Sequence, residues 1–96
     1  MKIDITKENG ILKVSPDGRL DTVTAPELEA LLADNYTSGD TVVFDCGKLV
    51  YVSSAGLRVL LGAQKNTKGA MKLINVCELV MEVLEMTGFA DILEIK

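Results

Sequence analysis

Two adjacent serines, Ser53 and Ser54, are the residues whose position most favours chemistry in this chain. They follow an apolar run at residues 41–44, and they precede an apolar stripe of helical spacing that begins at Leu57. A serine before a helix can cap it by accepting a hydrogen bond from an amide of the first turn. It can also accept a phosphoryl group, because free amides and the positive end of the helix dipole stabilise an anion. The two roles are compatible, since one serine can cap the helix while the other is modified.

Catalysis by these serines is not expected. The sequence has no histidine to activate a serine nucleophile or to supply a usual zinc ligand, and it has neither a phosphate-binding GxxxxGK[ST] loop nor a dinucleotide-binding glycine pattern. Cys46 and Cys77 are far apart and form no CxxC motif, so we expect buried, reduced thiols. The sequence therefore predicts a protein with no catalytic residues, no metal and no cofactor.

Length and composition predict a single folded domain over residues 1–96. Hydrophobic residues make up 48% of the chain and there are two prolines, which favours a globular fold. The net charge is −4 and basic residues do not cluster, so direct binding to nucleic acid is not expected. No apolar segment resembles a signal peptide or approaches the roughly 20 residues that span a bilayer. We expect a cytoplasmic protein that acts through other proteins.

The N-terminal half is predicted to contain a hairpin, a helix and a buried strand. Alternating apolar residues flank Asn9-Gly10, a pair typical of a tight hairpin turn, and residues 16–18 should break or bulge the second strand. Thr24 and Glu27 form a capping-box pattern at the start of a helix. The apolar run at 41–44 indicates a strand buried on both faces, followed by a loop that leads to the serines.

The C-terminal half is predicted to alternate helices and strands. The helix after the serines should end near residue 67, a strand should follow at 71–76, and a third helix should run from residue 77 or 78 to 86 with Leu79, Val80, Val83 and Leu84 on its buried face. Residues 92–95 should form a last short strand. The order β-β-α-β-α-β-α-β predicts one α/β domain with three main helices and a mixed, mostly parallel sheet that carries an N-terminal hairpin.

Residues 50–61 (VYVSSAGLRVLL) closely resemble the signature loop and helix of anti-sigma factor antagonists of the STAS-domain family. Residues 18–25 (GRLDTVTA) resemble that family's other recurrent loop, and the order of elements agrees over essentially the whole chain. The resemblance implies a regulatory switch. The unmodified protein binds an anti-sigma factor that is also a serine kinase, and so frees the sigma factor. The kinase then phosphorylates the antagonist, which lets go until a serine phosphatase resets it.

The resemblance also implies the site residues. The acceptor of the family lies two residues before a Gly-Leu pair, which here designates Ser54. Many relatives have aspartate where this chain has Ser53, so Ser53 remains the alternative acceptor, although it is better suited to cap the helix. The partner-binding surface is expected to comprise Asp21, Thr22, Ser53, Ser54, Ala55, Gly56, Leu57 and Arg58.

Several alternatives stay open from the residues alone. Asp21 is either a functional residue, which contacts the partner or orients the acceptor hydroxyl, or an Asx-turn residue that closes the loop before the first helix. Gly56 either lets a partner approach closely or packs against a neighbouring strand. Arg58 is either a simple solvated side chain or a contact for a carboxylate or phosphate. An alternative function is a STAS docking subunit of a transport or stress-signalling complex without a phospho-switch.

Overall fold

The chain forms one mixed sheet of six strands with three α-helices, and the computed structural model describes all residues from 1 to 96. The strands are β1 (Lys2–Glu8), β2 (Ile11–Leu20), β3 (Thr41–Asp45), β4 (Leu49–Val52), β5 (Met71–Ile74) and β6 (Glu94–Ile95). The helices are α1 (Ala25–Asn35), α2 (Ser54–Asn66) and α3 (Glu78–Met86), with a short 3-10 helix, η1 (Phe89–Asp91). The predicted fold class is confirmed, with one additional strand, β4.

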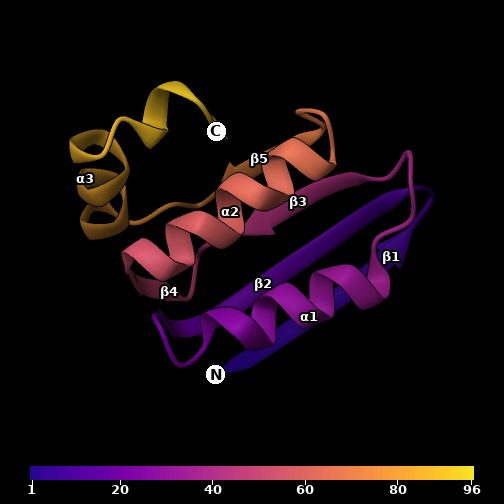
Figure 1. Cartoon of the computed structure of the whole chain (residues 1–96), viewed down its shortest axis with the longest axis horizontal. Helices are drawn as coiled ribbons and strands as arrows, with labels where there is room; N and C mark the ends of the chain where they lie inside the picture. Colours follow the sequence, from indigo (N-terminus) through magenta and orange to yellow (C-terminus); the bar gives the residue numbers. More distant parts are fainter.

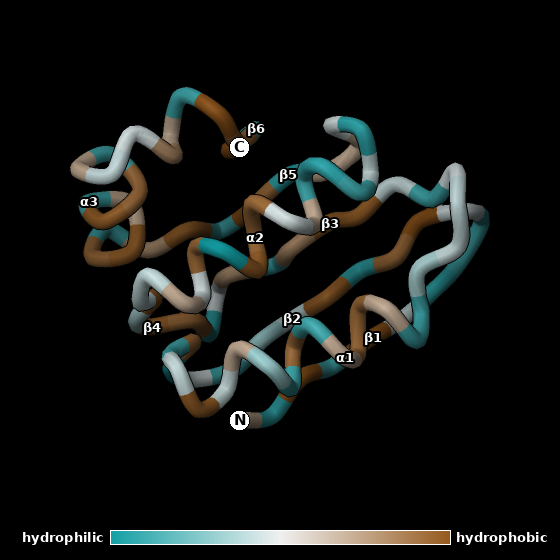
Figure 2. The backbone as a smooth tube through the Cα atoms, in the orientation of Figure 1, coloured by the Kyte–Doolittle hydropathy of each residue, from teal (hydrophilic) through white to brown (hydrophobic).

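The N-terminal hairpin forms as the sequence predicts. Strands β1 and β2 pair antiparallel, and the turn residues Asn9 and Gly10 have φ values of 53° and 76°. Both values lie in the left-handed region that a type I′ turn requires. Along β2, apolar and polar residues alternate, which places one row of side chains in the core (Figure 2).

Strand β2 is long enough to pair with two different strands on its second edge. Its residues 11–14 pair in parallel with β3, and residues 18–20 pair in parallel with β4. The register shifts between Gly18 and Arg19, where Gly18 has a φ of 105°, so the predicted bulge in this strand is confirmed. The prediction of a loop before the serines is wrong for Leu49–Val52, because these residues form β4. This strand is held by pairing with the end of β2, which no local pattern reveals.

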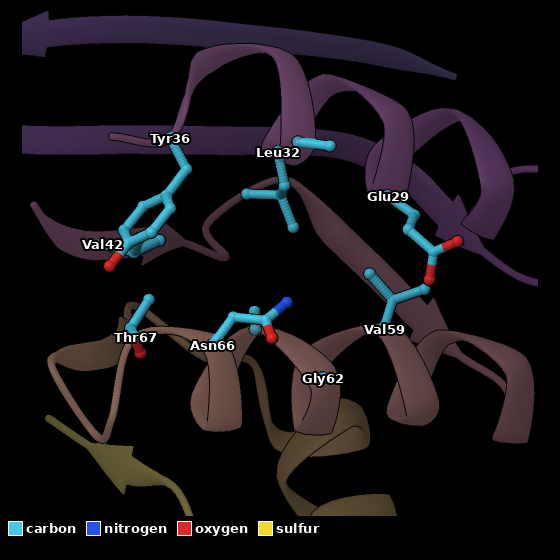
Figure 3. A pocket seen from close by; sticks show the side chains of 10 residues that line it. Glu29, Leu32, Tyr36, Val42, Val59, Gly62, Asn66 and Thr67 are labelled. Atoms are coloured by element: carbon cyan, nitrogen blue, oxygen red, sulfur yellow. The ribbon is translucent and has the colours of Figure 1, made fainter. Parts of the chain in front are cut away.

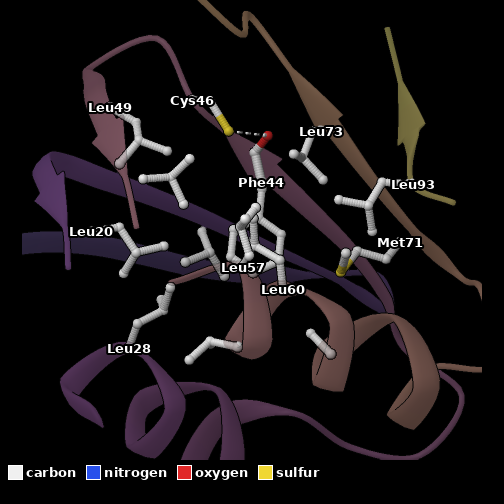
Figure 4. Packing of buried hydrophobic residues seen from close by; sticks show 14 of the residues in the cluster. Leu20, Leu28, Phe44, Cys46, Leu49, Leu57, Leu60, Met71, Leu73 and Leu93 are labelled. Carbon is white, nitrogen blue, oxygen red and sulfur yellow. Dashed lines mark hydrogen bonds between the residues drawn. The ribbon is translucent and has the colours of Figure 1, made fainter. Parts of the chain in front are cut away.

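The order of the strands in the sheet is β1-β2-β3-β5-β6, and the pairs β2–β3, β3–β5 and β5–β6 are parallel. Helices α1 and α2 lie next to each other over one face of the sheet, and α3 packs beside β4 (Figure 1). The core fills the space between the sheet and these helices, with Phe44, Leu28 and Leu60 among its fully buried side chains (Figure 4). None of the helices is long and apolar enough to cross a membrane.

Two burial predictions are wrong. Strand β3 is not buried on both faces: Val42 and Phe44 are buried, whereas Val43 is partly exposed. The helices over this strand lie on one side only, and on the other side Asp45 forms an ion pair with Lys13 at 3.7 Å. On α3, Leu79 is 54% exposed rather than buried, because the part of the helix that faces the core is narrower than the predicted stripe.

Candidate functional site

Helix α2 begins directly after Ser53, whose side chain caps it. Ser53 has an extended backbone, and its Oγ accepts a hydrogen bond from the Gly56 amide at 3.4 Å. Its carbonyl oxygen accepts the first helical hydrogen bond, from the Leu57 amide at 2.9 Å. The prediction that Ser53 is the N-cap is confirmed.

Ser54 is the first residue of α2, and it is exposed. Its hydroxyl makes no hydrogen bond within the chain, and the backbone amides of Ser54 and Ala55 have no partner. Such amides at the start of a helix cannot be satisfied by the helix itself, and they carry the positive end of its dipole. The Ser54 hydroxyl is therefore accessible and lies where a negative charge is stabilised.

Gly56 is buried and packs against the sheet. A Cβ atom on Gly56 would lie 2.7 Å from Leu20 Cγ, 2.9 Å from the Leu20 carbonyl oxygen and 2.9 Å from Val52 Cγ2. These distances are too short for real contacts, so close packing accounts for this glycine. Leu57 is only 5% exposed and belongs to the core. Gly56 and Leu57 were predicted to belong to the partner-binding surface, but both are buried and pack the first turn of α2 against the sheet.

The two loops that the sequence singles out leave the same edge of the sheet. Leu20 pairs with Val52 at the ends of β2 and β4, and the Ser53 amide donates a hydrogen bond to the Leu20 carbonyl oxygen at 2.8 Å. The chain therefore passes from Leu20 into Asp21 beside the point where Val52 passes into the serines. This pairing, which depends on the unpredicted strand β4, brings the loops together (Figure 1).

Asp21 forms the Asx-turn that was one of its two interpretations. Its Oδ1 accepts hydrogen bonds from the amides of Val23 at 3.0 Å and Thr24 at 3.1 Å. The hydrogen bond from the Thr24 amide is the main cause that lowers the pKa of Asp21 below its usual value of 3.8, and Arg19 adds a smaller effect. No hydrogen bond joins Asp21 to Ser54, so this carboxylate shapes its own loop rather than orienting the Ser54 hydroxyl.

The predicted capping box at α1 is wrong. Thr24 is the N-cap residue, but its side chain makes no capping bond. Its hydroxyl instead donates to the Arg19 carbonyl oxygen at 2.7 Å and accepts from the Asp21 amide at 2.9 Å. The Thr24 amide, which Glu27 was expected to bind, is already bonded to Asp21. The capping box requires the hydroxyl and the amide of Thr24, and both groups are already hydrogen-bonded within the turn before the helix.

Of the remaining predicted site residues, Thr22 and Arg58 are exposed, whereas Ala55 is half-buried and packs against the core. Thr22 lies at the tip of the Asp21 loop, and Arg58 lies on α2 one turn after Ser54 without an ion pair. Arg19, next to this loop, lies over the ring of Tyr51 with its Cζ atom 4.1 Å from the centroid. This cation–π contact joins β2 to β4 two residues before Ser53 and Ser54, which form the serine turn.

Sequence reasoning missed two exposed apolar residues near these loops. Val23 follows Thr22 and is 84% exposed, and Val50, on β4, is 52% exposed. Single exposed apolar side chains are common on protein surfaces, so these two valines alone do not define an interface. The exposure of Val23 could have been predicted, because it is an apolar residue between two threonines in a predicted loop. The exposure of Val50 could not have been predicted without knowing that residues 49–52 form β4.

Cys46 is buried, as predicted, and Cys77 is half-buried. Burial raises the pKa of the Cys46 thiol to about 12, so it stays protonated at neutral pH. No group of three or more histidine, cysteine, aspartate or glutamate residues could hold a metal ion.

A model of the STAS domain matches residues 2–96. The chain belongs to the STAS domain family. A Bordetella bronchiseptica protein that is provisionally named anti-sigma factor antagonist BtrV is 40% identical over 96 residues, covering 96% of this chain and 83% of the relative. The anti-sigma-B factor antagonist of Bacillus subtilis is 28% identical over 99 residues, covering 100% of this chain and 91% of the relative.

Solved structures share the fold of this STAS domain. The anti-sigma factor antagonist SpoIIAA in its unphosphorylated form has a TM-score of 0.81 at 15% identity and covers 99% of this chain and 88% of its own. The Bacillus protein in its phosphorylated form has a TM-score of 0.73 at 14% identity, with coverages of 99% and 91%. A sulfate transporter family protein from Wolinella succinogenes has a TM-score of 0.75 at 17% identity, with coverages of 92% and 75%. Because antagonists and a transporter family protein share it, the fold alone does not define the function.

Proposed function

We propose that this STAS domain is an anti-sigma factor antagonist whose binding to an anti-sigma factor serine kinase is switched off by phosphorylation of Ser54. The observation that carries the proposal is the division of roles between the serines: Ser53 caps α2, while the neighbouring Ser54 hydroxyl is exposed and unbonded. The names of the two relatives described above support the antagonist function. The chain acts as a binding protein and as a kinase substrate, without catalysis of its own.

The proposed binding surface is the edge where the two loops meet. Thr22, Ser54 and Arg58 contribute its polar side, the half-buried Ala55 lies between them, and the exposed Val23 gives it an apolar contact. The hydrogen bonds that Asp21 makes within its loop give this surface a defined shape before the kinase binds. A preorganised surface loses less conformational freedom on binding, which favours affinity.

Phosphorylation would change this surface in charge and in size. A phosphoryl group on Ser54 adds about −1.5 to −2 charges at pH 7. The unpaired amides of Ser54 and Ala55 would stabilise the phosphate in the free protein. Burying the same dianion against a partner costs free energy, and each 1.4 kcal/mol of that cost weakens binding about tenfold. A few kcal/mol are therefore enough for a switch that a serine phosphatase resets.

The test compares kinase capture by immobilised variants in lysate of the native organism. In lysate depleted of ATP, where the kinase cannot modify the wild type, we expect the wild type and Ser54→Ala to retain a serine kinase equally, and Ser54→Asp to retain at least about tenfold less. Ser38→Asp is the matched control, because Ser38 is also exposed but lies in the turn before β3, far from the serine turn in the sequence. Kinase recovery on Ser38→Asp should equal that on the wild type.

Equal kinase recovery on Ser54→Asp and on the wild type would contradict the switch. Recovery of a transporter or a large signalling assembly by all variants, with no serine kinase, would instead support the docking subunit without a phospho-switch.

A further inference from the structure

A cavity of about 190 Å³ opens between α1 and α2, on the helical side of the molecule (Figure 3). Val42 of β3 lies at its base, Leu32 of α1 and Val59 of α2 line opposite sides, and the Glu29 and Asn66 side chains reach it from the two helices. Six of its ten lining residues are hydrophobic. An apolar lining with a few polar groups is the usual composition of a small-molecule site.

Gly62 lines this cavity, and the packing of the fold does not explain it. A Cβ atom at Gly62 would meet no atom within 4 Å, and its φ is not positive. Glycine inside a helix destabilises the helix relative to alanine, so an unneeded glycine is a cost. Gly56, on the same helix, has a packing reason, because its Cβ would collide with Leu20. At Gly62, the missing side chain leaves the cavity open.

The charge of the cavity selects the kind of ligand. Glu29 is the only charged residue that lines it, and its carboxylate makes no ion pair or hydrogen bond within the chain. No lysine or arginine lines the cavity. An acidic group beside apolar walls complements a cation that carries an apolar body.

We propose that this cavity binds a small organic amine with one apolar ring. The ring would pack between Leu32, Val42 and Val59, and the ammonium group would face Glu29. A cavity of about 150 Å³ is enough for benzene, so the volume here accommodates one six-membered ring with a short aminoalkyl arm. The site is separate from the serine switch: Gly62 lies eight residues after Ser54, which is about 12 Å along a helix.

The test is a titration of the isotope-labelled full chain with phenethylamine, followed by amide NMR shifts. We expect saturable shifts at residues around the cavity, and about tenfold weaker binding of phenylacetate, which has the same ring and the opposite charge. Glu29→Gln should weaken phenethylamine binding about two- to fivefold and remove much of the preference over phenylacetate. Gly62→Leu should abolish binding because its side chain occupies the cavity.

Two further variants keep the test decisive. Ala30→Leu adds apolar bulk on an exposed part of α1 outside the cavity, and it should leave phenethylamine affinity unchanged. Gly62→Ala covers the case in which Gly62→Leu does not fold: its methyl group takes the space of about one ligand carbon and should weaken binding about fourfold.

Phenethylamine shifts that do not saturate, or that persist unchanged in Gly62→Leu or Gly62→Ala, would overturn the proposal. Equal affinity for phenylacetate would overturn its charge argument. Amide shifts around the cavity that change with protein concentration, without added amine, would show that a second copy of the chain occupies the cavity. That result would also overturn the proposal. Kinase capture by the wild type and Ser54→Asp is measured separately, so failure of either proposal is distinguishable from failure of the other.

Discussion

Replacing Gly56 by alanine should destabilise the domain, although alanine is the better helix former. The new Cβ would lie 2.7 Å from Leu20 Cγ and 2.9 Å from the Leu20 carbonyl oxygen. The leucine side chain can adjust, but the carbonyl oxygen is held by the hydrogen bond from the Ser53 amide that joins β2 to β4. Relief of the clash must therefore shift α2 or strain that strand end.

The size of this effect follows from two opposing contributions. Overpacking in a core costs about 1–3 kcal/mol, and the fixed backbone contact places Gly56→Ala in the upper half of that range. The gain in helix propensity returns about 1 kcal/mol. The free energy of unfolding should thus fall by about 1–2 kcal/mol. For a domain of this size, the melting temperature should fall by roughly 5–15 °C.

Gly62→Ala is the matched control on the same helix. Its Cβ meets nothing within 4 Å, so only the propensity gain remains, and the free energy of unfolding should rise by about 0.5–1 kcal/mol. Urea unfolding followed by far-UV circular dichroism measures both variants. The packing argument is refuted if Gly56→Ala is as stable as the wild type or gains stability as Gly62→Ala does.

Two further predictions concern the loops of the site. Ser53→Ala should lower the free energy of unfolding by about 0.5–1 kcal/mol, since the cap bond is long at 3.4 Å, whereas Ser54→Ala should leave it unchanged; equal losses in urea unfolding would refute the assigned roles. The folded state lowers the pKa of Asp21, so its stabilising effect is complete above pH 3.8 and is lost as the pH falls through the lower, folded pKa. The urea midpoint of Asp21→Asn should therefore decline less than that of the wild type below pH 3.8. Asp17→Asn is the control, because Asp17 is exposed and its carboxylate makes no hydrogen bond or ion pair. The urea midpoint of this variant should follow that of the wild type.

Local sequence signals predicted the elements whose causes are local. The Asn9-Gly10 turn needs two positive φ values, and the Ser53 cap depends on one side chain and an amide three residues later. Strand β4 escaped prediction because its only strand partner is the end of β2, about thirty residues earlier in the chain. Without β4, the meeting of the Asp21 loop and the serine turn at one edge could be implied only by the family resemblance.

The capping-box prediction failed because two carboxylates, those of Asp21 and Glu27, were each able to accept a hydrogen bond from the Thr24 amide. Thr24 and Glu27 match a capping box, but Asp21 reaches the Thr24 amide first because the chain turns tightly after Leu20. Gly56 fitted two interpretations until the position of Leu20 was known, since only tertiary packing separates a close contact within the fold from one with a partner. The cavity at Gly62 is likewise a product of helix packing and has no sequence signature.

Phosphopeptide mass spectrometry on the protein purified from its native cells tests the central claim most directly. Trypsin cleavage after Lys48 and Arg58 releases residues 49–58, a peptide that contains both Ser53 and Ser54. We predict a fraction that carries one phosphoryl group, with fragment ions that assign it to Ser54. Phosphate on Ser53 would contradict the assigned acceptor. The complete absence of a phosphorylated form across growth and stress conditions would contradict the switch itself.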